Sequence, residues 1–587
     1  MSRRRAVALT TWQKYLVDEL RSLVRAYSQD LRIVQQPHLD TDGYATLRLQ
    51  LHTTDILHRP GGLVLADDEE FVVKIRPSMF LPPSVEVDHT RFLGFPHVLQ
   101  GQRLCMYLDP SREWRPSSGM AGFLSRLWDW LTDAAGGVFD PSTAMYHAVG
   151  GVLHHAASTP TIVARETGPL KRQQIARLIP RSPHRYDLTY STDRDGQRVP
   201  VLVLTSDLPF GATSTFALLL RLLDDPHLDR AEGRSPQVSP QSPAFLTSLL
   251  ASALRNPNGT EQYFVLAVPH PAGGPHLLLC GRLPAGTADT LRRIAEKHGP
   301  AVNLDLATIN ADIPIEWCNM SDEREEVTTR RDDNRPVNGF RGTTVHIWGC
   351  GGLGSWIAEF IARAGVRSVT VCDPSAITGG LLVRQNYTEA DIGETKANAL
   401  ATRLRAIRDD LEVTVADGYI SDPTVSRTAD VIIDATVSHS ITAYLDTLAG
   451  EYRDALIAQV ATDAKTGTLG IATISASGAI STPSELDDQA GRLVLADGEL
   501  ELYHQLWGEA AEGDELIPTR GCSVPTFHGS AADLAAVAAT VTNLIGLHLT
   551  QKEAVTSGTH LIALPHAPAG PRHIFLQAGV AGSSRPI

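Results

Sequence analysis

The stretch that decides the fold is "VHIWGCGGLGSWIAEFIARAGVRSVTVCD", residues 345 to 373. The apolar run ending at Trp348 predicts a buried strand, and the glycines after it predict a tight turn. Apolar spacing from about Ser355 predicts a helix, and a second apolar strand ends at Asp373. This order of elements predicts a nucleotide-binding crossover in a doubly wound α/β domain.

The glycines of this turn suit the approach of a phosphate. Gly349, Gly351 and Gly354 supply the tight turn, the close backbone approach and the room for helix-on-strand packing. The helix that follows aims free amide groups at anionic oxygens, and Asp373 is placed to accept hydrogen bonds from ribose. Turn and carboxylate together indicate a dinucleotide or ATP, so an NAD-dependent oxidoreductase is one candidate.

Two cations after this strand favour a different chemistry. Arg384 and Lys396 stand twelve residues apart and bracket a polar turn. Nucleotidyl transfer develops charge on the α-phosphate and on the leaving pyrophosphate, which fixed cations stabilise. Hydride transfer has little need for such a pair, so the spacing favours ATP and nucleotidyl transfer.

The stretch "DPSAITGGLLVRQNYTEADIGETKANALATRLRAI" resembles the adenylation domain of ubiquitin-activating enzymes and of bacterial ThiF and MoeB type activators. The resemblance covers roughly residues 340 to 550 and implies ATP and Mg²⁺ as cofactors. It implies ribose binding by Asp373 and stabilisation of the α-phosphate by Lys396. The residues implied in phosphate binding are Gly349, Gly351, Gly352, Gly354, Arg384 and Gln385.

One position departs from that family. After "ADVIID" the family usually has an Asp-Asn pair whose Asp binds magnesium, and Val437 occupies that Asp position here. Asp434 is the nearest carboxylate. It could coordinate Mg²⁺ through water, or it could cap the turn that follows its strand.

Thioester-forming members of the family carry a cysteine in a loop that crosses over the adenylate. "IPTRGCSVPTFHGSAADLAAVAATVTNL" places Cys522 in such a loop, ahead of a helix that could stabilise its thiolate. Arg520 and His528 are its candidate helpers. The alternative is a cysteine that is simply buried.

The N-terminal part resembles the active-site region of ubiquitin-conjugating enzymes. The matching segments are "FLPPSVEV" and "GFPHVLQGQRLCMYLDPSREWRPSSG", in which Cys105 follows Leu104. The resemblance implies that Cys105 carries a thioester. His97 stands where the family has an Asn that supports the oxyanion, and it could donate a hydrogen bond, act as a base, or only pack the turn.

The length of 587 residues predicts roughly three or four domains, and the order of the predicted elements favours three. We expect an α+β ubiquitin-conjugating-like domain at 1–155, an α/β middle domain at 156–325 and a Rossmann-like, doubly wound α/β adenylation domain at 326–587. The charged run "SDEREEVTTRRDDNRP" predicts a solvated boundary before the last domain.

Charge and cysteine usage exclude several classes of function. A formal net charge of −14 argues against nucleic-acid or anionic-membrane partners, and we expect a cytoplasmic protein. The six cysteines form no C-x-x-C pair, which argues against a structural zinc site. Cysteines outside the two motifs are interpreted as structural: Cys280, Cys318, Cys350 and Cys372.

The whole chain resembles a bacterial fusion of a ubiquitin-conjugating domain with a ubiquitin-activating domain, as in anti-phage CBASS operons. This implies adenylation of a protein C-terminal tail, a thioester at Cys522, transfer to Cys105, and conjugation to an amine of an acceptor protein. The tail would belong to a CBASS nucleotidyltransferase or a ubiquitin-like protein, and a homodimer is expected by resemblance. The alternatives are a sulfur-carrier activator and an inactive scaffold.

Overall fold

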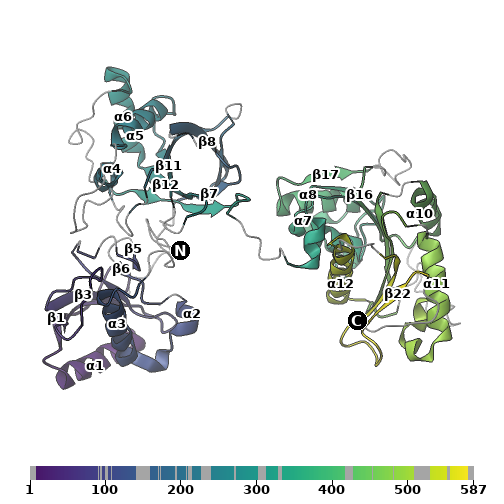
Figure 1. The fold of residues 1–587 in the computed structure, drawn as a ribbon, viewed down its shortest axis with the longest axis horizontal. Coiled ribbons are helices and arrows are strands. Elements are labelled where there is room, and N and C mark those ends of the chain that lie inside the picture. The colour runs from purple at the N-terminus through teal and green to yellow at the C-terminus, as the bar shows by residue number, and fades with distance from the viewer. Residues whose placement is uncertain are drawn as a thin grey trace. The chain divides into compact units, whose positions relative to one another are not determined.

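The computed structural model describes most of the chain. The described residues are 8–89, 91–92, 95–99, 103–107, 109–139, 159–168, 171, 173–191, 195–206, 208, 215–225, 240–269, 273–301, 313–327, 334–416, 428–451, 454–463, 465–479, 481–507, 529–550 and 556–579. The chain divides into two compact units, Met1–Thr329 and Arg330–Ile587. The first unit contains two separate sheets, and the second contains one (Figure 1).

The first sheet has six strands in the order β1-β2-β3-β4-β6-β5, with antiparallel neighbours. Its strands are β1 (Leu31–Leu39), β2 (Ala45–His52), β3 (Asp68–Ile75), β4 (Ser84–Glu86), β5 (Val98–Leu99) and β6 (Arg103–Leu104). Its helices are α1 (Thr11–Ala26), α2 (Pro110–Glu113), η1 (Pro116–Ser118) and α3 (Gly119–Ala135). Strand β2 alternates buried and half-buried residues, as a strand with one covered face should.

Helix α1 begins at a capped threonine. The Thr10 hydroxyl accepts from the Gln13 amide and the Gln13 side chain accepts from the Thr10 amide, which forms a capping box. Leu16 and Leu20, one turn apart, are buried in the same core as Phe123 of α3. The helical spacing of apolar residues thus places α1 and α3 around one core.

The second sheet, in the middle domain, has eight strands in the order β13-β12-β11-β10-β8-β9-β7-β14. Its strands are β7 (Thr161–Ala164), β8 (Gln173–Ser182), β9 (Arg185–Thr189), β10 (Gln197–Val203), β11 (Gln262–Val268), β12 (Leu277–Leu283), β13 (Glu316–Trp317) and β14 (Asn319–Asp322). Its helices are α4 (Phe216–Asp224), α5 (Ser242–Ala253) and α6 (Ala285–His298). Every residue of β11 is buried, as in a central strand covered on both faces.

The sheet of the second unit has eight strands in the order β17-β16-β15-β18-β19-β20-β21-β22. Its strands are β15 (Thr344–Trp348), β16 (Ser368–Cys372), β17 (Glu412–Val415), β18 (Val431–Asp434), β19 (Leu456–Thr462), β20 (Leu469–Ser475), β21 (Gly558–Ala563) and β22 (His573–Gln577). Strands β15 to β19 pair in parallel, and the remaining pairs are antiparallel. Parallel pairing around a central β15 is the doubly wound arrangement that the sequence predicts.

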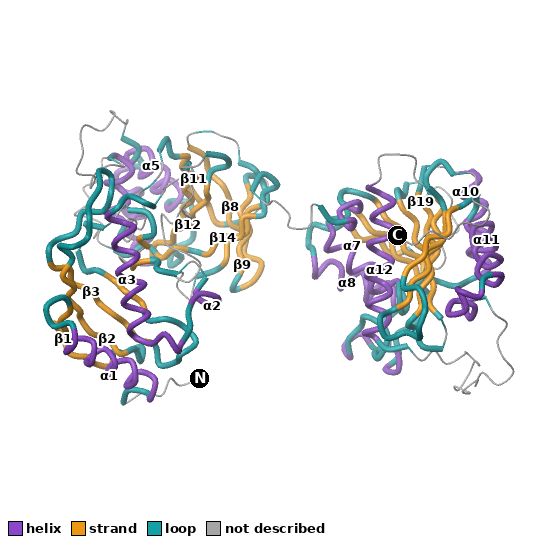
Figure 2. The backbone as a smooth tube through the Cα atoms, turned by 60° about the horizontal axis from the view of Figure 1, so that its bottom comes forward, coloured by secondary structure: helices purple, strands orange, loops and turns teal. Residues whose placement is uncertain are grey.

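Helices cover both faces of this sheet (Figures 1 and 2). The helices are η4 (Pro336–Phe340), α7 (Gly354–Ala364), η5 (Gly379–Leu381), η6 (Glu389–Asp391), α8 (Lys396–Ile407), α10 (His439–Glu451), α11 (Pro483–Ala496), η7 (Gly498–Leu506) and α12 (Ala531–Thr550). Helices α7, α8 and α12 share one apolar core, while α10 packs on the opposite face. By length and hydropathy α12 could cross a membrane, but its buried residues belong to the core of the sheet.

Two buried histidines and one half-buried histidine form a hydrogen-bonded row at the antiparallel edge. His548 Nε2 lies 2.8 Å from His560 Nε2, and His560 Nδ1 lies 3.0 Å from His573 Nε2. Burial lowers the pKa of His548 to about 4, and burial together with its two histidine neighbours lowers that of His560 to about 2. These rings are therefore neutral in the folded protein near pH 7.

This row of histidines makes the second unit sensitive to acid. Below the ordinary histidine pKa of 6.5 the unfolded chain binds more protons than the folded one. The free energy of unfolding therefore decreases as the pH is lowered. We expect a loss of up to about 1.4 kcal/mol per pH unit for each histidine between pH 6.5 and about 4. Urea unfolding of the full chain at pH 7, 6 and 5 measures it. His560→Gln should reduce the change of the free energy of unfolding with pH, whereas His439→Gln, at an exposed histidine, should not. The same pH dependence in His560→Gln and in the wild-type chain would contradict the prediction.

Candidate functional site

The carboxyl ends of three parallel strands meet around the glycine turn. Strand β15 pairs in parallel with β16 on one side and with β18 on the other. The loops that follow these three strands therefore begin at the same edge of the sheet. Gly349 follows β15 with φ 83°, and its amide donates to the Cys372 carbonyl at the end of β16 (2.9 Å). A side chain is strained at this φ, so the turn requires glycine there.

The other glycines differ in the space around them. A Cβ atom on Gly352 would lie 2.8 Å from Leu534 Cδ1, so this glycine allows α12 to pack closely. Among the described residues, a Cβ on Gly351 would meet only Gln385 Nε2, at 3.9 Å. The Gln385 side-chain oxygen is buried and has no hydrogen-bond partner in the described part of the chain. Open space over Gly351 beside an unsatisfied buried amide fits a polar ligand such as a nucleotide.

Asp373 supports the turn from the next strand. Its Oδ2 accepts from the Cys350 amide (2.8 Å), and its Oδ1 accepts from the Ser375 amide (2.9 Å). The carboxylate therefore helps to hold the glycine turn. Ribose binding by Asp373 stays a prediction, and it would use the remaining acceptor capacity of these oxygens.

The structure brings both predicted cations to the loop that follows Asp373. Arg384 is half-buried after η5, and its carbonyl accepts from Trp356 Nε1 (3.4 Å). Lys396 is the first residue of α8, and its amide donates to the Ser375 carbonyl (2.9 Å). The helix N-terminus carries a partial positive charge that repels the Lys396 ammonium group, and an anionic ligand bound beside both would offset this repulsion.

Tyr387 links the two ends of this loop, and the sequence analysis missed it. Its hydroxyl lies 2.7 Å from the Cys350 carbonyl and 3.2 Å from the Lys396 carbonyl. The ring is buried, and burial raises the pKa of its hydroxyl. Tyr387 therefore connects the glycine turn with the start of α8. In the sequence, its position directly after Arg384, Gln385 and Asn386 is the feature that could have indicated a role in this site.

Asp434 caps the turn that follows β18, one of the two roles that the sequence allows. Its Oδ1 accepts from the amide and hydroxyl of Thr436, and its Oδ2 accepts from Gln459 Nε2 (3.0 Å). Among the described residues no three His, Cys, Asp or Glu side chains converge on a metal position. Mg²⁺ needs only one or two carboxylates beside water and phosphate oxygens, so coordination by Asp434 through water stays a prediction, and it would use the remaining acceptor capacity of these oxygens.

Val437, in the place of the family's Asp, has a left-handed backbone. Its φ is 53°, and its side chain is 79% exposed. Asp and Asn tolerate this conformation, whereas a β-branched side chain is strained in it. The turn thus keeps a backbone suited to Asp but carries a residue that cannot bind a metal.

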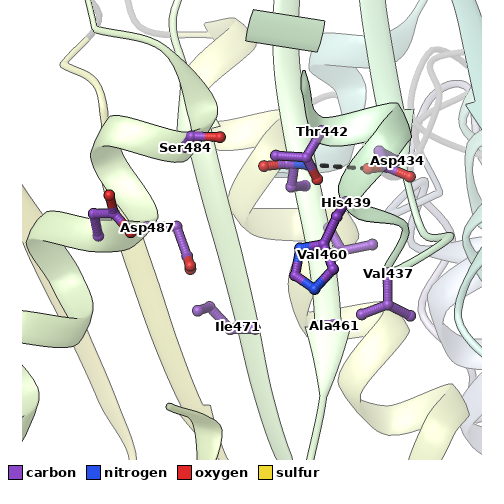
Figure 3. Close-up of a pocket in the computed structure, with 11 residues that line it drawn as sticks. Asp434, Val437, His439, Thr442, Val460, Ala461, Ile471, Ser484 and Asp487 are labelled. Carbon is purple, nitrogen blue, oxygen red and sulfur yellow. Dashed lines mark hydrogen bonds between the residues drawn. The ribbon is translucent and has the colours of Figure 1, made fainter. Parts of the chain in front are cut away.

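A pocket of about 290 Å³ opens beside this turn (Figure 3). Its lining residues are Asp434, Val437, His439, Thr442, Gln459, Val460, Ala461, Ile471, Ser484, Asp487 and Asp488. In Figure 3, Ser484 and Asp487 of α11 lie across the pocket from Asp434. The pocket therefore lies at the carboxyl ends of β18 and β19, between α10 and α11.

The first unit holds the second predicted site. The pairs Val98↔Leu104 and Leu99↔Arg103 place His97 opposite Cys105, and the Cys105 amide donates to the His97 carbonyl (2.8 Å). His97 has φ 64°, a conformation in which Asn and His are both enriched. The exchange of Asn for His is therefore compatible with this backbone.

The His97 side chain contacts an aromatic ring that the motif did not include. The ring centroids of His97 and Phe139 are 4.7 Å apart in an edge-on arrangement. Burial lowers the pKa of His97, so its imidazole is neutral near pH 7. The packing role is thus present in the structure, while oxyanion support or base catalysis stays a prediction.

Cys105 is a half-buried thiol. Burial raises its pKa, Glu113 raises it further, and Arg103 opposes them. The Sγ atom lies 3.7 Å from the Tyr107 carbonyl. Cys280, Cys318, Cys350 and Cys372 are fully buried, which agrees with a structural role. Cys522, Arg520 and His528 lie outside the described residues.

Comparisons with known families assign each part of the chain. The prokaryotic E2 family A matches residues 17–158, the Cap2 central linker domain matches 192–323, and the ThiF family matches 337–550. The chain is a fusion of an E2-like domain, a Cap2 central linker domain and a ThiF domain. The E2-like domain contains Cys105 and His97, and the ThiF domain contains the glycine turn with Arg384 and Lys396.

Individual relatives match over part of their length. The ThiF domain region is similar to the Bacillus subtilis (strain 168) sulfur carrier protein ThiS adenylyltransferase, with 39% identity over 16% of this chain and 27% of the relative. The Enterobacter hormaechei subsp. hoffmannii (strain UCI 50) ATP-dependent ubiquitin transferase-like protein Cap2 is 32% identical over 21% of each chain. A solved structure of E. coli MccB with AMPCPP and MccA covers 42% of this chain and 68% of MccB, with 14% identity and a TM-score of 0.30. This chain thus spans about a quarter of the two curated relatives.

The strained turn of the ThiF domain gives a stability prediction. Val437→Asn should raise the free energy of unfolding by about 1 kcal/mol, because Asn tolerates a positive φ that strains valine. Thermal unfolding of the full chain measures the change. Val383→Asn, at another exposed valine, is the matched control and should change stability little. A destabilised Val437→Asn variant would contradict the strain.

The half-buried thiol of the E2-like domain gives a reactivity prediction. In a Cys522→Ser background, the rate of alkylation of Cys105 by iodoacetamide should still rise with pH at pH 8.5, because burial raises the pKa of the thiol and keeps it protonated. Mass spectrometry of the alkylated peptide measures the rate, with N-acetylcysteine as the reference. A rate that levels off below pH 8 would show a thiolate stabilised by the protein.

Proposed function

We propose that this chain activates a protein C-terminus with ATP and conjugates it to an amine. A carboxylate oxygen of the partner attacks the α-phosphorus of ATP, and pyrophosphate leaves. The thiolate of Cys522 then attacks the acyl carbon and AMP leaves, giving a thioester. Exchange with Cys105 regenerates the Cys522 thiol, and attack by an amine forms the amide and frees Cys105.

The observation that carries this proposal is the combination of two sites in one chain. Among the described residues, the ThiF domain has an open glycine turn beside a Gln385 oxygen without a partner. Arg384 directly precedes Gln385, and Tyr387 joins the backbone of Lys396 to that of Cys350 in the turn. The E2-like domain has a half-buried cysteine at the end of a strand, opposite His97. Adenylation alone needs only the first site, so a retained cysteine hairpin favours acyl transfer after activation.

When bound, ATP supplies the activated phosphate, and the residues of the glycine turn would hold its phosphates through backbone amides. Arg384 and Lys396 would stabilise the charge that develops on phosphate oxygens. Gln385 has hydrogen-bonding capacity left for the nucleotide. Asp434 is the carboxylate that would hold Mg²⁺ through water, and no step is assigned to the ion.

The similarity to the ATP-dependent ubiquitin transferase-like protein Cap2 supports the conjugation chemistry. From the resemblance to bacterial fusions of CBASS operons we propose a role in anti-phage defence. We propose that the activated tail belongs to a CBASS nucleotidyltransferase or a ubiquitin-like protein, and that conjugation takes place in the cytoplasm. A homodimer formed through the ThiF domains is part of the proposal. The similarity to the ThiS adenylyltransferase favours a second candidate, in which the chain adenylates a sulfur carrier and forms no amide.

The relay is tested by loading the full chain with ATP, Mg²⁺ and a tail-bearing protein encoded beside it. We expect a thiol-labile adduct on non-reducing gels and in intact mass, and its absence in Lys396→Ala. Cys522→Ala should abolish loading of Cys105, whereas Cys105→Ala should trap the adduct on Cys522. Cys280→Ala, at a fully buried cysteine of the linker domain, should leave the ratio of the two adducts unchanged.

Two other outcomes separate the candidates. Formation of an acyl adenylate without either thioester would favour the sulfur-carrier function. Failure of the wild-type chain to form an adenylate would contradict both enzyme functions and leave the scaffold. Thioester formation in Lys396→Ala at the wild-type rate would contradict the role of Lys396 at the α-phosphate.

A further inference from the structure

Glu359 is a buried carboxylate in the middle of helix α7. It is 7% exposed, although apolar residues occupy most buried positions of this helix. Its Oε1 accepts from Arg363 Nη2 (2.6 Å), and its Oε2 accepts from Asn386 Nδ2 (2.6 Å) and Arg403 Nε (2.7 Å). A charge taken out of water needs such partners, so the carboxylate is held at a definite position.

The partners of Oε2 come from two other elements of the candidate ATP site. Asn386 directly follows Gln385, so it belongs to the same loop as Arg384. Arg403 lies on α8, seven residues after Lys396, which is about two helical turns further along. Glu359 itself lies on the helix that starts at the glycine turn. One carboxylate thus joins α7, the loop of Arg384 and the helix of Lys396.

A second path connects the same loop with the turn itself. The backbone amide of Asn386 donates to Ser355 Oγ (3.2 Å), and the Ser355 hydroxyl donates to the Gly351 carbonyl (2.7 Å). Both residues are buried. Continuous hydrogen bonds therefore run from Gly351 through Ser355 and Asn386 to Glu359 and Arg403. The path thus joins the turn to the loop that contains Arg384 and to the helix that begins at Lys396.

The ionised form of Glu359 is the one that these contacts require. Burial opposes its charge, but the hydrogen bonds from Arg363, Asn386 and Arg403 outweigh burial and lower the pKa to about 2. All of these partners are donors. A neutral amide in its place would present an NH₂ group to some of them, so at least one contact would break.

We propose that Glu359 is a positioning residue, which holds Arg384 and Lys396 in register with the glycine turn for binding the phosphates of ATP. This inference rests on the proposed function, because it assigns the phosphates to that site. Glu359 does not touch the nucleotide in this role. It acts through Asn386 and Arg403, and its effect should therefore fall on phosphate recognition and spare recognition of the nucleoside.

The test compares two ligands on the full chain by isothermal titration calorimetry. Glu359→Gln should raise the Kd for ATP about tenfold, since small displacements of fixed charges weaken their contacts. The Kd for adenosine should not change. A merely structural role would alter both ligands together or only the melting temperature, so the ratio of the two constants is the deciding readout.

Arg363 provides the matched control. It is a partner of the same carboxylate, but it lies four residues along the same helix and its side chain is 59% exposed. Arg363→Ala leaves both bonds of Oε2 in place. We expect the wild-type ratio of Kd values in Arg363→Ala. A tenfold change in this variant would overturn the assignment to the bonds of Oε2.

Two further variants keep the inference testable if Glu359→Gln does not fold. Asn386→Ala and Arg403→Ala each remove one bond of Oε2, and each should raise the Kd for ATP but not that for adenosine. Wild-type ratios in every folded variant would overturn the inference while leaving the proposed function intact. Absence of ATP binding by the wild-type chain would instead overturn the proposed function.

Discussion

The hydrogen bond from the Cys350 amide to the Asp373 carboxylate is the contact on which the ThiF domain's site depends. It joins the turn after β15 to the end of β16, two parallel neighbours in the middle of the sheet. Parallel strands end at the same edge, so this bond closes one side of the turn. Asp434 performs a similar task after β18, on the other side. The glycine turn is therefore held between two capped strand ends.

Polar groups near this edge fall into two sets, those that the protein satisfies and those that it leaves available. Asp434 and Glu359 have donors on both oxygens. Within the described part of the chain, Gln385 keeps a buried oxygen without a partner, and Gly351 faces open space. Buried polar groups are seldom left unpaired without a reason, so the available set marks where a ligand belongs. The satisfied set provides the rigid frame around it.

The departures from the families follow from backbone conformation. Position 97 requires a left-handed backbone that Asn and His both adopt, and the replacement therefore keeps the geometry of the Cys105 hairpin. Position 437 requires the same conformation, yet it carries valine. The first change preserves a polar group beside the cysteine. The second removes a carboxylate, and with it the most direct magnesium ligand that the family would offer.

Much of the organisation could be predicted from the sequence, because it depends on short spacings. The glycine turn and the strand before Asp373 involve neighbours within a few residues, and the structure agrees with both. Tertiary structure alone decided the contacts that bring distant segments together. Phe139 reaches His97, and Arg403 reaches Glu359, because helices fold back over strands. These contacts could not be predicted from the sequence, because the order of residues does not give the distances between segments that are far apart along the chain.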